Sequence, residues 1–454
     1  MLEFRIEKKL GNGLGRAGVI RTEHGEIRTP TFMVVGTRGE VKFMSMDDLR
    51  NVSAQGMLSN GYHLRGKAEE IFQAGGLAKW NGWNGPTVTD SGGFQVMSLG
   101  SGLGKVVSMG AEATADNSSA SADAVLTHRT RSTARSTPSA SLNNLSAEAS
   151  AGWADKDNHS ASPAVLNNLA TGTSAGNSNE AHAENLVKIT EEGVHFTDPW
   201  TGKPDFISPE ESMRIQCKIG ADIHMAFDEL TSIADDYDYN VSAMRRTERW
   251  AERSLVEHNK HRRDLGYDQN LYGVLQGGRW EDLRRATARK LGAMEFDGFG
   301  LGGAFLKEDL GEILRWCDEE LPEEKPRHLL GLSRPDDLFI GAEMGADTFD
   351  CVAPMREARH GKIYTREGDF NLRKFMGSEL ALDEGCDCLT CQSGMTRGRL
   401  RELWKNPETK LEFFRLATIH NVRFIVRLCE EIRESILCGN FYEFKREFLG
   451  RYLS

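Results

Sequence analysis

Short apolar runs alternate with amphipathic stretches along most of the chain, and this alternation limits the possible folds more than any other feature. Each run ends in glycine or polar residues, as β-strands do. Eight such runs occur, at 29–35, 56–60, 87–90, 224–229, 271–278, 297–303, 327–332 and 348–352. Helical patterns at 244–264 and 279–294 separate some of the later runs. Eight strands alternating with helices predict an α/β chain built as a (β/α)8 barrel.

Two further patterns refine this prediction. The runs LEFRIEKKL at 2–10 and AGVIRTEHGEI at 17–27 predict an N-terminal antiparallel hairpin that caps one end of the barrel. Ser208 and Ser333 each stand shortly before a proline and an acidic residue, a pattern typical of the first turn of a helix. We therefore expect Ser208 and Ser333 to be the N-caps of two helices, with Pro209 and Pro335 in their first turns.

The segment from 104 to 185 differs in composition from the rest of the chain. It is rich in Ala, Ser, Asn, Thr and Gly, and LNNLSAEASAG at 142–152 returns as LNNLATGTSAG at 166–176. Such a sequence buries too little apolar surface to offset its ordering entropy, so we expect a flexible insertion in a loop. The chain then divides into 1–103 with the hairpin and first barrel strands, 104–185 as the insertion, 186–355 as the remaining barrel, and 356–454 as a C-terminal subdomain.

The charge of the chain is uneven. The net charge of −11 argues against a uniformly basic surface for nucleic acid. Residues 356–454, however, hold 18 Lys and Arg against 15 Asp and Glu, whereas the preceding part holds 38 against 52. The C-terminal part is therefore where a polyanionic partner is expected. The N-terminus resembles no signal peptide and no run has the length of a membrane span, so a cytoplasmic protein without a membrane partner is expected.

Acidic residues follow three different predicted strands. Asp90, Asp228 and Asp350 each stand at the end of a run, and the carboxyl ends of barrel strands meet at one face. Two carboxylates can act as nucleophile and as acid or base at a sugar C1′. The amide of Gln276 and the backbone N–H groups of Gly303 and Ala304 are suited to reading the edge of a base. Phe94 is suited to stacking on it. Any one of these residues alone fits a turn or a helix cap equally well.

Three cysteines crowd into six residues. Cys386, Cys388 and Cys391 offer three thiolates, and His420 is the best candidate for a fourth ligand, which together predict a structural Zn2+ site. The isolated cysteines are expected to be small core residues; they are Cys217, Cys317, Cys351, Cys429 and Cys438.

A basic segment follows Asp350 directly. It contains Arg356, Arg359, His360 and Lys362. Arginines beside the predicted site are suited to gripping phosphates or a base edge, and a solvated charged loop is the alternative.

These motifs together resemble one family. The sequences DSGGFQV at 90–96, FDEL at 227–230, LQGGRWEDLR at 275–284, FDGFGLGG at 296–303, FDCV at 349–352 and CDCLTC with IHN resemble the bacterial type of tRNA-guanine transglycosylase. The resemblance covers the chain except the insertion. It implies a (β/α)8 barrel with a C-terminal zinc subdomain and one Zn2+ per chain.

The resemblance also implies roles for individual residues. Asp350 matches the nucleophile that attacks C1′ of the wobble guanosine, and Asp90 matches the acid/base residue. Substrate-binding positions are matched by Ser91, Phe94, Asp228, Gln276, Gly303, Ala304 and Glu308, and tRNA-binding positions by Arg334, Arg356 and Arg359. The implied reaction replaces guanine in tRNA with a GUN anticodon by a 7-deazaguanine, either prequeuosine-1 base or queuine.

The sequence departs from the family pattern at three places. Leu230 stands where a cysteine is usual, Phe305 lies in the base-reading loop, and Arg399 stands near an expected interface aromatic. The identity of the deazaguanine and the formation of a homodimer therefore stay open. The alternatives are a DNA-acting transglycosylase, a non-catalytic zinc-bearing tRNA-binding subunit, and an unrelated barrel enzyme whose Gly-Gly loops bind phosphate.

Overall fold

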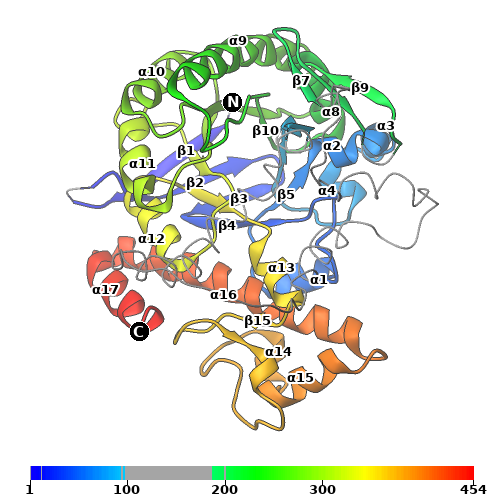
Figure 1. Cartoon of the computed structure of the whole chain (residues 1–454), viewed down its shortest axis with the longest axis vertical. Helices are drawn as coiled ribbons and strands as arrows, with labels where there is room; N and C mark the ends of the chain where they lie inside the picture. Colours follow the sequence, from blue (N-terminus) through cyan, green and yellow to red (C-terminus); the bar gives the residue numbers. More distant parts are fainter. Residues whose placement is uncertain (1, 12, 94–95, 98–186, 199–200) are drawn as a thin grey trace, which may run out of the picture.

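The computed structural model describes residues 2–11, 13–93, 96–97, 187–198 and 201–454 (Figure 1). The predicted insertion at 104–185 and the predicted stacking residue Phe94 lie outside these residues.

Eight parallel strands form a closed barrel in the order β10-β11-β12-β13-β14-β4-β5-β6. In chain order, the last barrel strand, β14, pairs with the first, β4, through Thr348 opposite Thr31 and Asp350 opposite Met33. The strands are β4 (Thr31–Val35), β5 (Met57–Asn60), β6 (Thr87–Asp90), β10 (Ile223–Met225), β11 (Asn270–Leu275), β12 (Gly298–Leu301), β13 (Arg327–Leu329) and β14 (Thr348–Asp350). Every one overlaps a predicted run, so the barrel prediction is confirmed.

Helices connect these strands and surround the barrel (Figure 1). Among the described residues between β4 and β12 they are α1 (Met46–Asn51), α2 (Gly61–Leu64), the 3-10 helix η1 (Arg65–Lys67), α3 (Ala68–Gln73), α4 (Leu77–Trp80), α8 (Pro209–Ile219), α9 (Tyr237–His261) and α10 (Glu281–Gly292). From β12 to the end of the barrel they are the 3-10 helix η5 (Lys307–Asp309), α11 (Leu310–Asp318), α12 (Pro335–Glu343) and α13 (Ala353–Arg359).

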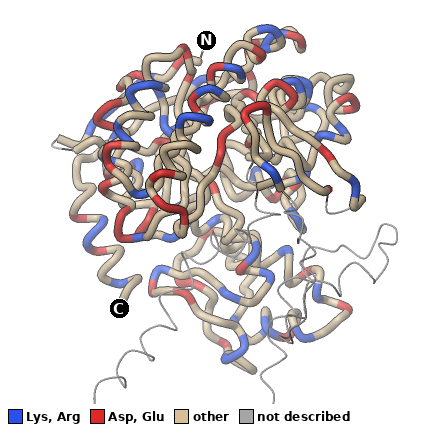
Figure 2. Tube along the Cα trace, turned by 45° about the horizontal axis from the view of Figure 1, so that its top comes forward, with Lys and Arg blue, Asp and Glu red and all other residues tan. Residues whose placement is uncertain are grey.

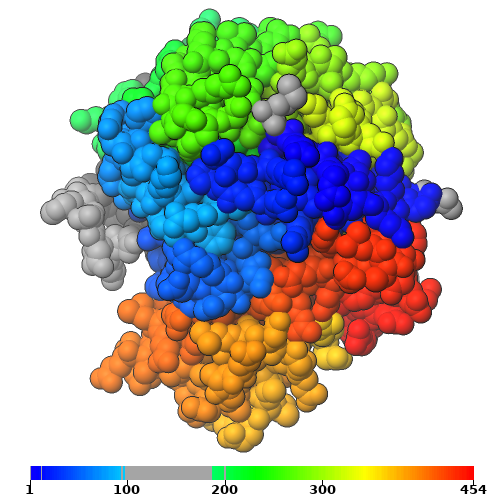
Figure 3. Space-filling view, turned by 180° about the vertical axis from the view of Figure 1, so that it is seen from behind, coloured from blue at the N-terminus to red at the C-terminus, as the bar shows by residue number. Residues whose placement is uncertain are grey.

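An antiparallel sheet covers the N-terminal end of the barrel strands. The predicted hairpin is present as β1 (Glu3–Lys9) and β2 (Arg16–Thr22), and a third strand, β3 (Gly25–Thr29), extends it. Arg16 pairs with Asp347 at 2.6 Å, directly before β14, and His24 Nδ1 lies 2.9 Å from Asp222 Oδ1, directly before β10. Figure 3 shows these N-terminal strands across the back of the molecule. The sheet closes the end opposite to the one where the predicted site residues lie.

A second antiparallel sheet was not predicted. It comprises β7 (Val187–Ile189), β8 (Val194–Thr197) and β9 (Pro204–Ile207), and lies between β6 and α8 in the chain. Asp198, just after β8, accepts hydrogen bonds from Tyr62 Oη at 2.9 Å and Arg65 Nη2 at 2.8 Å. These contacts tie the sheet to α2 and η1.

The two predicted helix starts have different outcomes. Ser208 is the N-cap of α8, and its hydroxyl accepts from the backbone N–H of Glu211 at 3.2 Å, as expected. Helix α12 does begin at Pro335, but Arg334 is its N-cap and no side chain caps it, so the prediction for Ser333 was wrong. Ser333 stands one residue too early, because Pro335 itself takes the first helical position.

The C-terminal part packs along one side of the barrel (Figure 1). It consists of the hairpin β15 (Lys362–Ile363) and β16 (Phe370–Asn371), the 3-10 helix η6 (Leu372–Lys374), α14 (Leu389–Gln392), α15 (Arg397–Lys405), α16 (Lys410–Cys438) and α17 (Phe441–Tyr452). No helix among the described residues is both long and apolar enough to cross a membrane.

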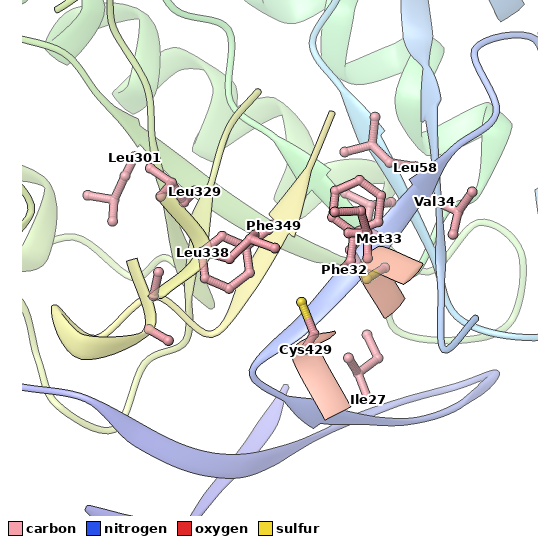
Figure 4. Packing of buried hydrophobic residues seen from close by; sticks show 14 of the residues in the cluster. Ile27, Phe32, Met33, Val34, Leu58, Leu301, Leu329, Leu338, Phe349 and Cys429 are labelled. Carbon is pink, nitrogen blue, oxygen red and sulfur yellow. The ribbon is translucent and has the colours of Figure 1, made fainter. Parts of the chain in front are cut away.

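Helix α16 joins this part to the barrel core. Cys429 of α16 lies in one apolar cluster with Phe32 of β4 and Phe349 of β14 (Figure 4). Arg415 of α16 binds the buried carboxylate of Asp48 of α1, with Nε 2.9 Å from Oδ2. Arg433 donates to the carbonyl oxygens of Gly18 at 2.9 Å and Thr29 at 2.7 Å. One helix therefore contacts the N-terminal sheet, the barrel and the C-terminal subdomain.

Candidate active site

Asp350, the last residue of β14, is held by two hydrogen bonds at a single oxygen. Its Oδ1 lies 3.1 Å from His328 Nε2 and accepts from the backbone N–H of Gly331 at 3.0 Å. His328 Nδ1 in turn lies 2.8 Å from Thr348 Oγ1. A carboxylate only accepts, so His328 donates from Nε2 and Thr348 donates to Nδ1. Asp350 Oδ2 accepts no hydrogen bond from the described residues, which leaves one oxygen available to a reacting atom.

Asp90, the last residue of β6, lies at the same end of the barrel in a different environment. Asn60 Nδ2 donates to its Oδ2 at 2.8 Å, and the backbone N–H groups of Gly61 and Gly92 donate to its Oδ1 at 3.3 and 3.1 Å. Burial, together with the nearby charge of Asp350, outweighs these bonds and raises the pKa of Asp90 from 3.8 to about 7. Asp90 therefore exchanges a proton near neutral pH, as an acid/base group needs to.

The third predicted carboxylate belongs to a separate hydrogen-bonded group. Gln276 Nε2 donates to Asp228 Oδ2 at 2.7 Å, and Ser91 Oγ lies 3.5 Å from Asp228 Oδ1. Burial raises the pKa of Asp228 to about 6. Gln276 Oε1 is buried and has no hydrogen-bond partner among the described residues. An unpartnered buried oxygen is costly, and a ligand N–H group would satisfy it.

The Gly-Gly loop after β12 rests on a buried arginine. Arg284 of α10 donates to the carbonyl oxygens of Gly278 and Gly302, each at 2.8 Å, and so joins the loops that follow β11 and β12. Gly303 has a φ of +125°, and a Cβ there would lie 2.3 Å from Arg284 Nη2. The guanidinium of Arg284 also faces the ring of Phe305 at 5.6 Å. Phe305 thus covers the arginine that supports the loop, with buried Ala304 between it and Gly303.

The remaining predicted binding residues lie around this end of the barrel. Glu308 is exposed on η5, and Arg334 precedes α12, with its Nε 3.5 Å from Asp336 Oδ1. Arg356 and Arg359 lie on α13, and among the described residues neither pairs with a carboxylate. Burial and the charge of Arg356 lower the pKa of Arg359. Two adjacent guanidinium groups without counter-charges suit a phosphate-bearing ligand.

Basic residues in the C-terminal part do not form one uniform surface. Figure 2 shows Lys and Arg positions among acidic ones over this part of the chain. The two unpaired arginines of α13 are therefore more informative than the net charge of the region.

Glu229 takes no part in the site, although it follows the same predicted strand as Asp228. It is fully buried and pairs with Arg246, and Tyr239 Oη donates to it at 2.9 Å.

The four predicted metal ligands do meet. The side chains of Cys386, Cys388, Cys391 and His420 bring one ligand atom each to within 4.8 Å of one another. The three sulfurs lie 3.8, 3.5 and 3.3 Å from His420 Nδ1, and His420 Nε2 donates to the carbonyl oxygen of Tyr364 at 2.8 Å. This bond fixes the ring so that Nδ1 faces the sulfurs, as in metal centres. The donor set fits a tetrahedral Zn2+ that links α14 to α16.

Three contributors to the site were absent from the sequence predictions. Asn60, His328 and Arg284 act through residues far from them in sequence. Arg284 stood within the motif LQGGRWEDLR, which was a usable signal. Asn60 ends a predicted strand, as the predicted site residues do, whereas His328 lies inside one and gave no signal of its own.

Fold and site together define a (β/α)8-barrel protein with carboxylates gathered at the C-terminal end of the strands and a Cys3His cluster beside the barrel. The family model of queuine tRNA-ribosyltransferase matches residues 11–121 and 169–454. The chain therefore belongs to the queuine tRNA-ribosyltransferase family. The unmatched residues are 1–10, at the N-terminal end, and 122–168, which fall inside the segment with the internal repeat.

Individual relatives agree with this assignment. A chain of Archaeoglobus fulgidus, provisionally described as a queuine tRNA-ribosyltransferase, is 37% identical over 468 residues, covering 99% of both chains. The queuine tRNA-ribosyltransferase of Shouchella clausii is 35% identical and covers 98% of this chain and 94% of its own. That of Lactococcus lactis is 35% identical and covers 99% and 96%.

Proposed function

We propose that this protein exchanges guanine in tRNA for a 7-deazaguanine, with Asp350 as the nucleophile and Asp90 as the acid/base. The observation that carries the proposal is the contrast between the two carboxyl groups. Asp350 has one oxygen bound by His328 and Gly331 and the other unbound by described residues, whereas the pKa of Asp90 is raised to about 7. Carboxyl groups in such different environments take different roles.

The first half of the reaction breaks the bond between guanine and ribose. Asp350 Oδ2 attacks C1′, the C1′–N9 bond breaks, and its electron pair leaves with guanine. Protonated Asp90 supplies the proton that neutralises the departing base. His328 and the N–H of Gly331 keep the attacking carboxylate oriented through Oδ1.

The second half reverses the roles. After guanine leaves, a 7-deazaguanine takes its place, and Asp90, now ionised, accepts the N9 proton of the incoming base. N9 attacks C1′ and the C1′–Asp350 bond breaks, so two inversions give net retention. A pKa of about 7 lets Asp90 act in both directions.

In this proposal, side chains around the two carboxyl groups recognise the base and the tRNA. Gln276, Ser91 and Asp228 offer donors and acceptors for the edge of the base, with the unpartnered Gln276 Oε1 as the clearest acceptor. Arg356 and Arg359 lie on the helix that directly follows the nucleophile, where they suit phosphates of an anticodon loop. The preferred tRNAs are those with a GUN anticodon. Zn2+ at the Cys3His cluster is structural and holds this region together.

The test is exchange of radiolabelled guanine into a tRNA with a GUN anticodon. The wild type should incorporate label, and D350N should incorporate none while forming no adduct with tRNA on a denaturing gel. D238N, which changes an exposed carboxylate at the start of α9, is the matched control and should behave as the wild type. A DNA hairpin of the same sequence serves as the second substrate. Label in the DNA hairpin alone would assign the protein to DNA, and full activity of D350N would reject Asp350 as the nucleophile.

A further inference from the structure

A second cluster of metal-ligating side chains lies on the outer side of the barrel, away from both the carboxylates and the Cys3His cluster. Cys217 of α8, His224 of β10 and His258 of α9 bring one ligand atom each to within 4.8 Å of one another. Cys217 Sγ lies 3.9 Å from His224 Nδ1 and 3.7 Å from His258 Nδ1. Cys217 is 2% exposed and both histidines are fully buried.

The orientation of His258 matches that of His420 in the Cys3His cluster. His258 Nε2 donates to the carbonyl oxygen of Gln269 at 3.1 Å, so the lone pair of Nδ1 faces Cys217 Sγ. His420 likewise donates Nε2–H to a backbone carbonyl and turns Nδ1 toward sulfur. Such a bond on the far ring nitrogen is typical of metal-ligating histidines.

The protonation states of the histidines also suit a ligand role. Burial lowers the pKa of His258 to about 4 and that of His224 well below its usual value, so both rings are neutral at physiological pH. Burial raises the pKa of the Cys217 thiol to about 12, so an ion would displace one proton from it. The charge of Arg262 acts on all three side chains, and it is offset by Asp268, which lies 3.5 Å from its Nε, and by Glu257 and Asp264 near Cys217.

Hydrogen bonding does not fully satisfy this group. His224 Nε2 and Gln269 Oε1 are both buried without a partner among the described residues. Gln269 belongs to the same surroundings, since its Nε2 donates to the carbonyl oxygen of Cys217 at 3.2 Å. Buried polar atoms left in this state are unusual in a well-packed region, so hydrogen bonds alone do not account for this polar group.

The two sulfur–nitrogen distances determine the bond angles that an ion between these atoms would have. With bonds of about 2.3 Å to sulfur and about 2.05 Å to nitrogen, the two separations correspond to S–metal–N angles of about 127° and about 116°. These angles lie near the 120° of trigonal coordination. From this geometry we propose that Cys217, His224 and His258 form a second metal site, which takes a thiophilic d10 ion, Zn2+ or Cu+. The ion would fasten α8 and α9 to β10.

The first experiment counts metals in the full-length protein. Cells are grown with added zinc in one culture and added copper in another, and the purified protein is analysed for both metals under reducing, oxygen-free conditions. The proposal expects two ions per chain in the wild type, and the element found in excess over the Cys3His content identifies the occupant. One ion per chain in both cultures would overturn the proposal without any variant.

The second experiment assigns the extra ion. C217A and H258Q should each bind one ion fewer than the wild type, whereas C429A, which changes a buried cysteine outside any such cluster, should bind the full number. X-ray absorption of the zinc-loaded wild type should show an average of two sulfur ligands per ion, against three when the Cys3His site alone is filled. If the wild type holds two ions but C217A and H258Q keep both, the ion lies elsewhere and the proposal fails. If the variants do not fold, the wild-type absorption spectrum is the test: an average of two sulfur ligands per ion supports the site, and an average of three rejects it.

Discussion

At the scale of single residues, the raised pKa of Asp90 links the site to the stability of the protein. A carboxyl group whose pKa is about 7 in the folded protein and 3.8 when unfolded stabilises the fold only while it is protonated. The free energy of unfolding therefore falls as the pH rises from about 4 to about 7. At neutral pH, the negative charge of ionised Asp90 lowers the free energy of unfolding of the substrate-free protein.

D90N should remove this dependence. Because Asn stays neutral, the variant should be more stable than the wild type at about pH 8, by roughly 1 to 3 kcal/mol since the carboxyl is partly open to solvent. The difference should shrink toward zero at about pH 4. Chemical unfolding at several pH values measures it, with D238N as the control for losing an exposed charge. An equal stability difference at every pH would contradict the raised pKa.

Asn60 provides a second residue-scale test. Its hydrogen bond lowers the pKa of Asp90, so N60A should raise that pKa further. The limb of the pH–rate profile assigned to Asp90 should move upward by about one pH unit. A profile that keeps its limb, in a variant with unchanged thermal stability, would show that another group titrates there.

In the proposed mechanism, His328 is the positioning residue for Asp350, the proposed nucleophile. H328Q removes the bridge between Thr348 and Asp350, so the turnover number for base exchange should fall by about 10- to 100-fold while KM for tRNA changes little. H195Q, at an exposed position on β8, is the matched control. If H328Q lowers thermal stability and the amount of active protein, but the folded fraction keeps the wild-type turnover number, the role of His328 is structural.

These residues also show how far sequence alone reaches. Asp90, Asp228 and Asp350 were found because strand ends are visible as a pattern, and parallel strands bring their ends together. The Cys217, His224 and His258 group was missed, because its members come from three elements and only folding brings them together. Cys217 was read as a core residue, which its burial fits, but its neighbours could not be predicted.

At the scale of elements, the loop after β12 depends on Gly303. G303A should lower the free energy of unfolding and the exchange rate together, because its Cβ would lie 2.3 Å from Arg284 Nη2 and disturb the contacts of Arg284 with both loops. G266A is the matched control, since Gly266 has a φ of +84° but open space around it. That variant should cost only about 1 kcal/mol from backbone strain. Equal losses in the two variants would show that strain, not Arg284, explains the effect.

Element boundaries were predicted well where the chain itself marks them. Ser208 caps α8 because its hydroxyl reaches the N–H of Glu211, whereas Ser333 fails because Pro335 places α12 one residue later. The sheet β7–β9 was missed because its strands are short and follow the low-complexity segment. No regular alternation of apolar and polar residues therefore indicated them.

At the scale of the whole molecule, the Cys3His cluster stabilises more than its own loop. Asn421, next to His420, donates to the carbonyl oxygens of Pro354 at 3.2 Å and Lys362 at 3.0 Å, and so holds α13 and its two arginines. C391S should lose the metal, lower Tm by at least about 5 °C and weaken tRNA binding. C438S, at an exposed cysteine, is the control. If metal-free C391S binds tRNA with normal affinity, the Cys3His cluster does not contribute to tRNA binding.

Helix α16 also constrains how the protein can be synthesised. The ribosome releases α16 after all eight barrel strands, yet Arg433 of α16 donates to Gly18 and Thr29, and β4 pairs with β14. Until then the nascent chain carries early strands that lack both their neighbour and their covering helix. The barrel therefore cannot close before β14 has been synthesised, and a chain terminated before α16 should be degraded instead of accumulating as a smaller barrel. We therefore expect chaperones that shield unpaired strands to bind the nascent chain.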